Sequence, residues 1–74
     1  MRKKEYCELK ELKRLLKRKS LSYRSFSKSI SISTDALNNK LNGYSCFNAA
    51  EICKISKVLK ISSSDIGFYF FPEY

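Results

Sequence analysis

Histidine is absent from this sequence, and the seven aspartate and glutamate residues are spread along its 74 positions without a close pair. Imidazoles and paired carboxylates carry out much of the acid–base and metal chemistry of proteins. Their shortage predicts that the chain is not an enzyme and uses no metal or other cofactor. A chain this short is also expected to form one domain, residues 1–74, with a modest core and no deep cleft.

Cysteines and apolar runs are scarce as well. The three cysteines, Cys7, Cys46 and Cys53, are odd in number and have no C-x-x-C spacing, which fits neither a disulfide framework nor a zinc site. We expect reduced thiols, with Cys53 packed beside the apolar side chains of its helix. No apolar stretch approaches the length of about 18 residues that a membrane span needs. The expected location is the cytoplasm of a bacterial cell, in association with the nucleoid and without membrane contact.

Positive charge is what the chain has in excess, and it is concentrated at one end. Residues 1–30 contain eleven lysines and arginines against three acids, whereas residues 31–74 contain four of each. The first part therefore accounts for the whole net charge of +8. Such a basic block favours a polyanionic partner, although a merely solvated helix face has a similar composition.

Helical periodicity and helix start signals organise the chain. An amphipathic helix is predicted in the first segment, where apolar residues recur at helical spacing. Further on, a serine or asparagine is four times preceded by an apolar residue and followed by another four positions later, as in an N-cap with a hydrophobic staple. The predicted caps are Ser22, Ser33, Asn48 and Ser62, and the last two have an acid, Glu51 or Asp65, three residues on.

These signals predict five helices, over residues 5–19, 22–30, 33–42, 48–60 and 62–71. Only two residues, Ser31 and Ile32, separate the second predicted helix from the cap of the third. Two short helices joined so tightly must cross steeply, which is the helix-turn-helix arrangement. The predicted fold class is therefore all-α, a compact five-helix domain with a helix-turn-helix at its second and third helices.

The segment from Ser22 to Gly43 resembles the helix-turn-helix of the Cro/repressor (XRE-like) family, especially its small phage members. The residues that carry the resemblance are Phe26, Ser27, Ile30, Ile32, Ser33, Leu37 and the run 39–43, and residues 50–71 are similar to the last two helices of phage relatives. The resemblance implies a lambda-repressor-like DNA-binding domain. It also implies that Ser27 occupies the small position where the two motif helices touch.

Three positions depart from the family pattern. Ser31 stands where the family usually has glycine, so we expect a left-handed or adjusted backbone there. Tyr23 replaces a glutamine that often contacts DNA, which leaves a phenol that can contact a phosphate. Asp35 suits the dipole at the start of the recognition helix but would repel a phosphate.

Base recognition is inferred from the family's docking of its recognition helix in the major groove. By that resemblance, the base-reading residues are Thr34, Asp35, Asn38 and Asn39. An asparagine amide matches the N6/N7 edge of adenine, and no arginine is available for the bidentate contact with guanine. We therefore expect a site rich in A·T pairs. For the two asparagines, a solvated helix face remains the alternative interpretation.

Phosphate contacts would position the protein without reading the sequence. The predicted DNA-backbone residues are Lys19, Ser22, Tyr23, Lys28, Ser33, Lys40, Asn42, Gly43, Tyr44 and Ser45. Two cations closer to the N-terminus, Lys10 and Lys13, are expected to supply only long-range attraction. With four charged contacts per subunit, log affinity should fall against log salt with a slope of about −3.6.

Aromatic residues are concentrated at the C-terminus, where residues 68–74 hold five of the ten. A domain of this size cannot bury all of them, so some must cap the core and others lie exposed. We expect Phe68 or Phe71 in the core. The remaining three, Tyr69, Phe70 and Tyr74, are the predicted interface of a homodimer, because relatives pair through this end to span two half-sites.

Two functions follow from the resemblance. The first is a phage Cro-like repressor, which occupies a double-stranded operator and excludes polymerase. The alternative is a Cro-like antirepressor or modulator that binds a partner repressor protein, an interpretation that Asp35, Tyr23 and the missing recognition-helix arginine favour.

Overall fold

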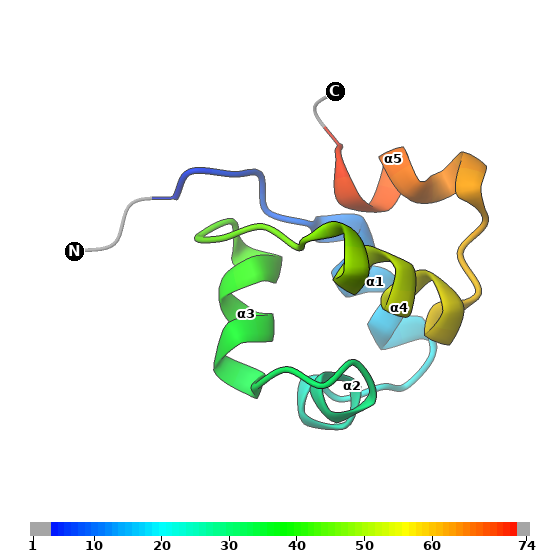
Figure 1. Ribbon diagram of the computed structural model, residues 1–74, viewed down its shortest axis with the longest axis horizontal. Coiled ribbons are helices and arrows are strands. Elements are labelled where there is room, and N and C mark those ends of the chain that lie inside the picture. The colour runs from blue at the N-terminus through cyan, green and yellow to red at the C-terminus, as the bar shows by residue number, and fades with distance from the viewer. Residues whose placement is uncertain (1–3, 73–74) are drawn as a thin grey trace.

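The computed structural model describes residues 4–72 and contains no strand within that range, which confirms the predicted all-α class. Five α-helices and one 3₁₀-helix follow one another as α1 (Lys10–Arg18), α2 (Tyr23–Ser29), α3 (Thr34–Asn42), α4 (Ala49–Leu59), η1 (Ser63–Asp65) and α5 (Ile66–Phe70). In Figure 1, α2 and α5 lie at opposite ends of the view, with α1 and α4 between them and α3 at one side.

The first helix begins at Lys10, and the predicted start at residue 5 is wrong. Contacts with the end of α3 explain the difference, because the backbone N–H groups of Glu5 and Tyr6 donate to the carbonyl of Gly43 at 3.1 and 3.0 Å. The N–H of Leu9 donates to Leu41 at 2.9 Å. Residues 5–9 therefore lie against the end of α3, and Leu9 is buried there by a tertiary contact.

Three of the four predicted caps are confirmed. The side-chain oxygens of Ser22, Ser33 and Asn48 each accept a hydrogen bond from the backbone N–H three residues on. Ser62 is the exception, since its hydroxyl bonds the side chains of Ser64 and Asp65. The predicted helix over 62–71 is accordingly divided into η1 and the short α5.

The core gathers apolar side chains from α1 to α5 and from the segment before α1. Its buried members are Leu9, Leu12, Leu15, Leu16, Phe26, Ile30, Leu37, Leu41, Phe47, Ile55, Leu59 and Phe70. Several further apolar side chains, among them Leu21, Ile32, Ile52, Ile61 and Ile66, are partly buried and pack against this core.

Two predictions about burial are wrong. Phe70 fills the C-terminal place in the core and meets the ring of Phe47 edge to face at 5.8 Å, whereas Phe68 and Phe71 are 55% and 44% exposed. The short α5 directs the ring of Phe70 inward, and Phe68 and Phe71, which are spaced i, i+3, lie on the outside. Cys53 is also exposed, because the inward face of α4 is formed by Ile55 and Leu59.

Candidate nucleic-acid interface

The second and third helices pack against each other and cross steeply, as the sequence predicts, since Figure 1 shows α2 nearly end-on and α3 across that direction. Ser27 is buried where they meet, with its hydroxyl donating to the carbonyl of Arg24 at 2.9 Å and lying 3.2 Å from the hydroxyl of Thr34. The turn closes when the N–H of Ile32 donates to the carbonyl of Ser27 at 3.0 Å. Ser31 adopts a φ of +60°, which confirms the expected left-handed backbone.

The outward face of α3 is polar. Leu37 and Leu41 face the core, while Thr34, Asp35 and Asn38 are exposed and Asn39 is half-buried. All four predicted base-reading residues thus belong to one surface of one helix, and we call them the α3 polar row. The hydroxyl and amide groups of this row can donate and accept hydrogen bonds, but none of its four side chains carries a positive charge.

The side chain of Asn42, a predicted contact of the DNA backbone, is hydrogen-bonded to other residues of the protein. Its Nδ2 donates to the backbone carbonyl and to the Oδ1 of Asn38, at 2.9 and 3.0 Å, and its Oδ1 accepts from the Nζ of Lys13. Lys13 also bonds Glu8 at 2.8 Å. Asn42 therefore orients Asn38 and ties α3 to α1, so its amide is already engaged within the protein.

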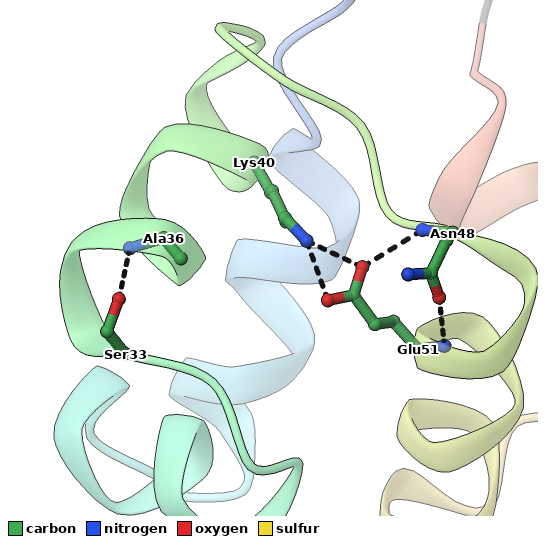
Figure 2. A network of polar contacts seen from close by, with 5 residues as sticks. All are labelled: Ser33, Ala36, Lys40, Asn48 and Glu51. Atoms are coloured by element: carbon green, nitrogen blue, oxygen red, sulfur yellow. Dashed lines mark hydrogen bonds and ion pairs between the residues drawn. The ribbon is translucent and has the colours of Figure 1, made fainter.

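Lys40, a predicted contact of the DNA backbone, is paired with an acid of the protein itself. Its Nζ lies 2.6 Å from both carboxylate oxygens of Glu51, and only 16% of its side chain is exposed. Figure 2 shows the ammonium pointing from α3 toward the first turn of α4, where Glu51 also accepts from the N–H of Asn48 at 2.9 Å. The capping box of α4 and the ion pair share one carboxylate, and together they join α3 to α4.

The ion pair also controls the ionisation of Glu51. Burial would raise the pKa of Glu51, but the hydrogen bonds from Lys40 and Asn48 and the charges of Lys40 and Lys54 outweigh it and hold the pKa below its ordinary value of 4.5. A carboxylate with a depressed pKa stabilises the fold fully above its unfolded value and loses that contribution as the pH falls through the folded value. The contribution is thus lost on acidification below about pH 4.5.

Glu51→Gln is expected to lower the free energy of unfolding at pH 7 by about 2 kcal/mol, since glutamine keeps the capping box but leaves the Lys40 ammonium without its charged partner. The difference from the unmodified protein should shrink as the pH falls below about 4.5. Urea unfolding followed by circular dichroism measures both effects. Glu11→Gln is the control, because the Glu11–Arg14 pair is on the surface and should contribute less than about 1 kcal/mol. Equal losses for the two variants at pH 7 would contradict the assignment.

The backbone of the loop after α3 is also largely hydrogen-bonded within the protein. Gly43 ends the helix at a φ of +94°, its N–H donates to the carbonyl of Asn39, and its own carbonyl accepts from Glu5 and Tyr6. The N–H of Tyr44 donates to Asn39 at 2.9 Å, and the Nζ of Lys4 lies 5.7 Å from the Tyr44 ring. The N–H and the carbonyl of Gly43, a predicted DNA-backbone residue, are therefore both hydrogen-bonded within the protein. Ser45 is half-buried in the same loop.

Cations that the sequence left out of the site lie beside the start of α2. A shallow groove of about 420 Å³ is lined by Ser22, Tyr23 and two apolar side chains together with Lys13, Arg14 and Lys17 of α1. The expectation that Lys13 is distant from the motif is wrong, because the α1–α2 turn places the start of α2 beside Lys13 of α1. Arg24 is exposed on α2 and was missed, although its position one residue after Tyr23 could have indicated it. We call the groove the cationic groove, and the residues that line it are Lys13, Arg14, Leu16, Lys17, Leu21, Ser22 and Tyr23.

The other predicted DNA-backbone residues lie exposed on the surface, and two of them are helix caps. Lys19 and Lys28 are exposed, and the hydroxyls of Ser22 and Ser33 accept cap hydrogen bonds from Ser25 and Ala36 at 3.1 and 3.0 Å. The Ser33–Ala36 bond is visible in Figure 2.

The predicted homodimer interface at the C-terminus is wrong in one of its three residues. Phe70 is only 6% exposed and belongs to the core, so it is not available to a second copy. Tyr69 is half-buried and packs against the core, with its ring 5.1 Å from that of Phe68. Tyr74 lies outside the described residues.

Within residues 4–72, no three acidic or thiol side chains gather closely enough to hold a metal ion. No helix of that range has the length and apolarity to cross a bilayer.

The chain matches the model of a protein family over most of its length. The model of the family described as "Protein of unknown function (DUF739)" matches residues 7–73, which include all five helices. No curated protein matches the chain.

Proposed function

We propose that this chain, which belongs to the DUF739 family, is a sequence-specific DNA-binding protein that regulates transcription in the manner of a Cro-like repressor. The observation that carries the proposal is the crossed α2–α3 pair, locked by the buried Ser27, with the α3 polar row on its outside. A row of amide, hydroxyl and carboxylate groups on an exposed helix is suited to the base edges of a major groove.

Base recognition would depend on the amides of the α3 polar row. The Oδ1 of Asn38 accepts one bond from Asn42, which fixes the amide plane and leaves a second lone pair for the N6 of adenine. Asn39 lies one position further on the same surface. Since Lys40 is paired with Glu51, α3 offers no cation to guanine, and we expect an operator rich in A·T pairs.

Backbone contacts would come from the cationic groove and its surroundings. Tyr23 and Ser22 lie in the groove with Lys17, while Lys19, Arg24 and Lys28 are exposed nearby in the sequence. A protein with a net charge of +8 would gain affinity for DNA by releasing condensed counterions. Occupation of an operator by such a protein would exclude polymerase.

Selection from a library of random duplex DNA tests the proposal. We expect the chain to enrich a motif rich in A·T pairs, with log affinity falling against log salt at a slope of about −3.6 for four charged contacts. Asn38→Ala with Asn39→Ala should weaken binding to the selected duplex about 10-fold or more, with little change on unrelated duplex. Fluorescence anisotropy with labelled duplexes measures these affinities.

Two charge variants distinguish a lysine that contacts the DNA from one that contributes only to the net charge. Lys17→Gln should reduce the salt slope by about 1, whereas Lys57→Gln, which removes an exposed cation from α4, should leave it nearly unchanged. Binding without an enriched motif, or an enriched motif indifferent to both asparagines, would contradict the proposal.

A second candidate function has one observation in its favour. Asp35 is exposed, and it is the only charged side chain of α3 outside the Lys40–Glu51 pair. A negative recognition surface suits a cationic protein surface, such as the DNA-binding face of a partner repressor. A modulator of this kind would retard DNA in a mobility-shift assay only when the repressor is present, whereas the Cro-like protein would act alone.

A further inference from the structure

A chain of four polar side chains connects the segment before α1 with the α3 polar row. The Nζ of Lys13 donates to Glu8 at 2.8 Å and to the Oδ1 of Asn42. The Nδ2 of Asn42 in turn donates to the backbone carbonyl and to the Oδ1 of Asn38, at 2.9 and 3.0 Å. We call Glu8, Lys13, Asn42 and Asn38 the polar relay. It crosses from α1 to α3, two helices that pack against each other.

The hydrogen bonds of the polar relay run in one direction, which the ammonium of Lys13 determines. An ammonium group can only donate, so the amide of Asn42 must present its oxygen to Lys13 and its nitrogen to Asn38. Asn38 must then present an oxygen to Asn42. Since Asn38 is exposed, rotation about its χ2 would otherwise allow the oxygen and the nitrogen of its amide to exchange places. The positive charge on α1 therefore selects one of two orientations of the Asn38 amide.

Glu8 holds Lys13 in the position from which it reaches Asn42. The side chains of Lys13 and Glu8 are 24% and 33% exposed, so the ion pair is partly shielded from water. The hydrogen bond from Lys13 and its charge hold the pKa of Glu8 below its ordinary value of 4.5, with smaller contributions from Lys4 and Lys10. Glu8 is therefore ionised at neutral pH. Without this partner, the long lysine side chain would regain much of its rotamer freedom.

An adenine base distinguishes the two ends of the Asn38 amide. A bidentate contact requires the amide oxygen to accept from N6 and the amide nitrogen to donate to N7. The bond from Asn42 occupies one lone pair of the Asn38 oxygen and leaves the second, and it keeps the nitrogen at the end of the amide away from Asn42. An amide that has rotated by half a turn would offer its two ends in the opposite order and could not make the same contact.

The geometry points to Glu8 and Lys13 as positioning residues for base recognition, which act through Asn42 to hold the Asn38 amide in the orientation that suits adenine. The inference rests on the proposed function, and it gives a part in specificity to two residues outside the recognition helix. Lys13 thereby differs from the other cations of the cationic groove, which would contact phosphates of any sequence. Loss of the polar relay should change which base is preferred, and loss of a phosphate contact should not.

Nuclear magnetic resonance of the free protein tests the orientation of Asn38 without DNA. We expect the order parameter of its side-chain amide to be above about 0.6 in the unmodified protein and to fall below that value in Lys13→Met. Methionine keeps most of the length of lysine but cannot donate to Asn42. Lys17→Met makes the same change at a groove residue outside the polar relay, and it should leave the order of Asn38 unchanged.

Anisotropy titration with duplexes that differ at one base pair tests the effect on specificity. The pair read by Asn38 is the one in the selected motif at which Asn38→Ala removes the preference for adenine. There, the ratio of the affinities for adenine and guanine should fall about fivefold or more in Lys13→Met and in Glu8→Ala. Lys17→Met should lower both affinities and keep their ratio.

The charge of Glu8 separates the polar relay from general electrostatics. Glu8→Ala makes the protein more positive, so its affinity for unrelated duplex should rise while its preference for adenine falls. Glu5→Ala makes the same change of charge at an exposed side chain of the same segment. It should raise the affinity for every duplex and leave the preference for adenine as it was.

Four results would overturn the inference. An Asn38 amide that stays ordered in Lys13→Met would do so, as would a motif in which Asn38→Ala alters no position. An adenine preference that survives Lys13→Met and Glu8→Ala at a position sensitive to Asn38→Ala would overturn the polar relay alone and leave the proposed function standing. Failure of the unmodified protein to enrich any motif would contradict the proposed function itself and, with it, the part of Glu8 and Lys13 in base recognition.

Discussion

Gly43→Ala is expected to destabilise the protein by about 3 kcal/mol or more, a large share of the roughly 4–11 kcal/mol that holds a domain of this size folded. At a φ of +94° a side chain is strained, and a Cβ there would lie 2.4 Å from the backbone oxygen of Tyr6. The clash cannot be relieved by rotating a side chain. It would separate the segment before α1 from the end of α3 and break the two hydrogen bonds that Glu5 and Tyr6 donate.

Thermal unfolding followed by circular dichroism measures this loss as a decrease in Tm of about 12–24 °C. The control is Gly67→Ala, because a Cβ at Gly67 meets nothing within 4 Å and alanine favours the helix. That variant should be as stable as the original or up to about 1 kcal/mol more stable. Similar losses for the two variants would mean that the contact between Gly43 and Tyr6 does not constrain the fold.

Helix starts were predictable because their signals are local. Ser22, Ser33 and Asn48 each bond a backbone N–H only three residues away, so the pattern and the structure agree. Helix ends were harder, since Ser20 and Lys60 adopt left-handed φ values of 57° without being glycine. Only at Ser31 did the family pattern indicate such a backbone.

The start of α1 could not be predicted from periodicity. Tyr6 and Leu9 have helical spacing with Leu12, but their backbone is bound by the end of α3 about thirty residues away. A periodic pattern describes which side chains are buried and cannot distinguish a helix from an extended segment that packs on one.

The candidate site also combines features that the sequence could predict with features that depend on tertiary contacts. The α3 polar row was predictable, since the position of Leu37 and Leu41 defines the outward face of the helix. Lys40 was not, because its partner Glu51 belongs to another helix and has a second role in the capping box. The cationic groove also depends on a tertiary contact, which the α1–α2 turn creates.

Ser27 connects the fold to the proposed function, because it decides how closely α2 and α3 approach. It is only 2% exposed, and its hydroxyl bonds Arg24 and lies 3.2 Å from the hydroxyl of Thr34, the first residue of the α3 polar row. A small side chain here allows the close crossing, and a larger one must push the helices apart. The angle of the polar row relative to the cationic groove therefore depends on the volume of one side chain.

Ser27→Leu is expected to lower the free energy of unfolding by about 2–4 kcal/mol, through overpacking and the lost hydroxyl bonds. It should also weaken binding to the selected duplex by about 10-fold or more at a temperature where the variant is still folded, because the row and the groove no longer fit one DNA surface together. Ser27→Ala removes the same hydroxyl without adding volume, so it should cost only about 1 kcal/mol and bind DNA nearly as before. Urea unfolding and anisotropy titration on the same samples separate the two effects. A folded Ser27→Leu protein with undiminished affinity would show that the helix crossing does not set the DNA-binding surface, since the two variants differ there only in volume.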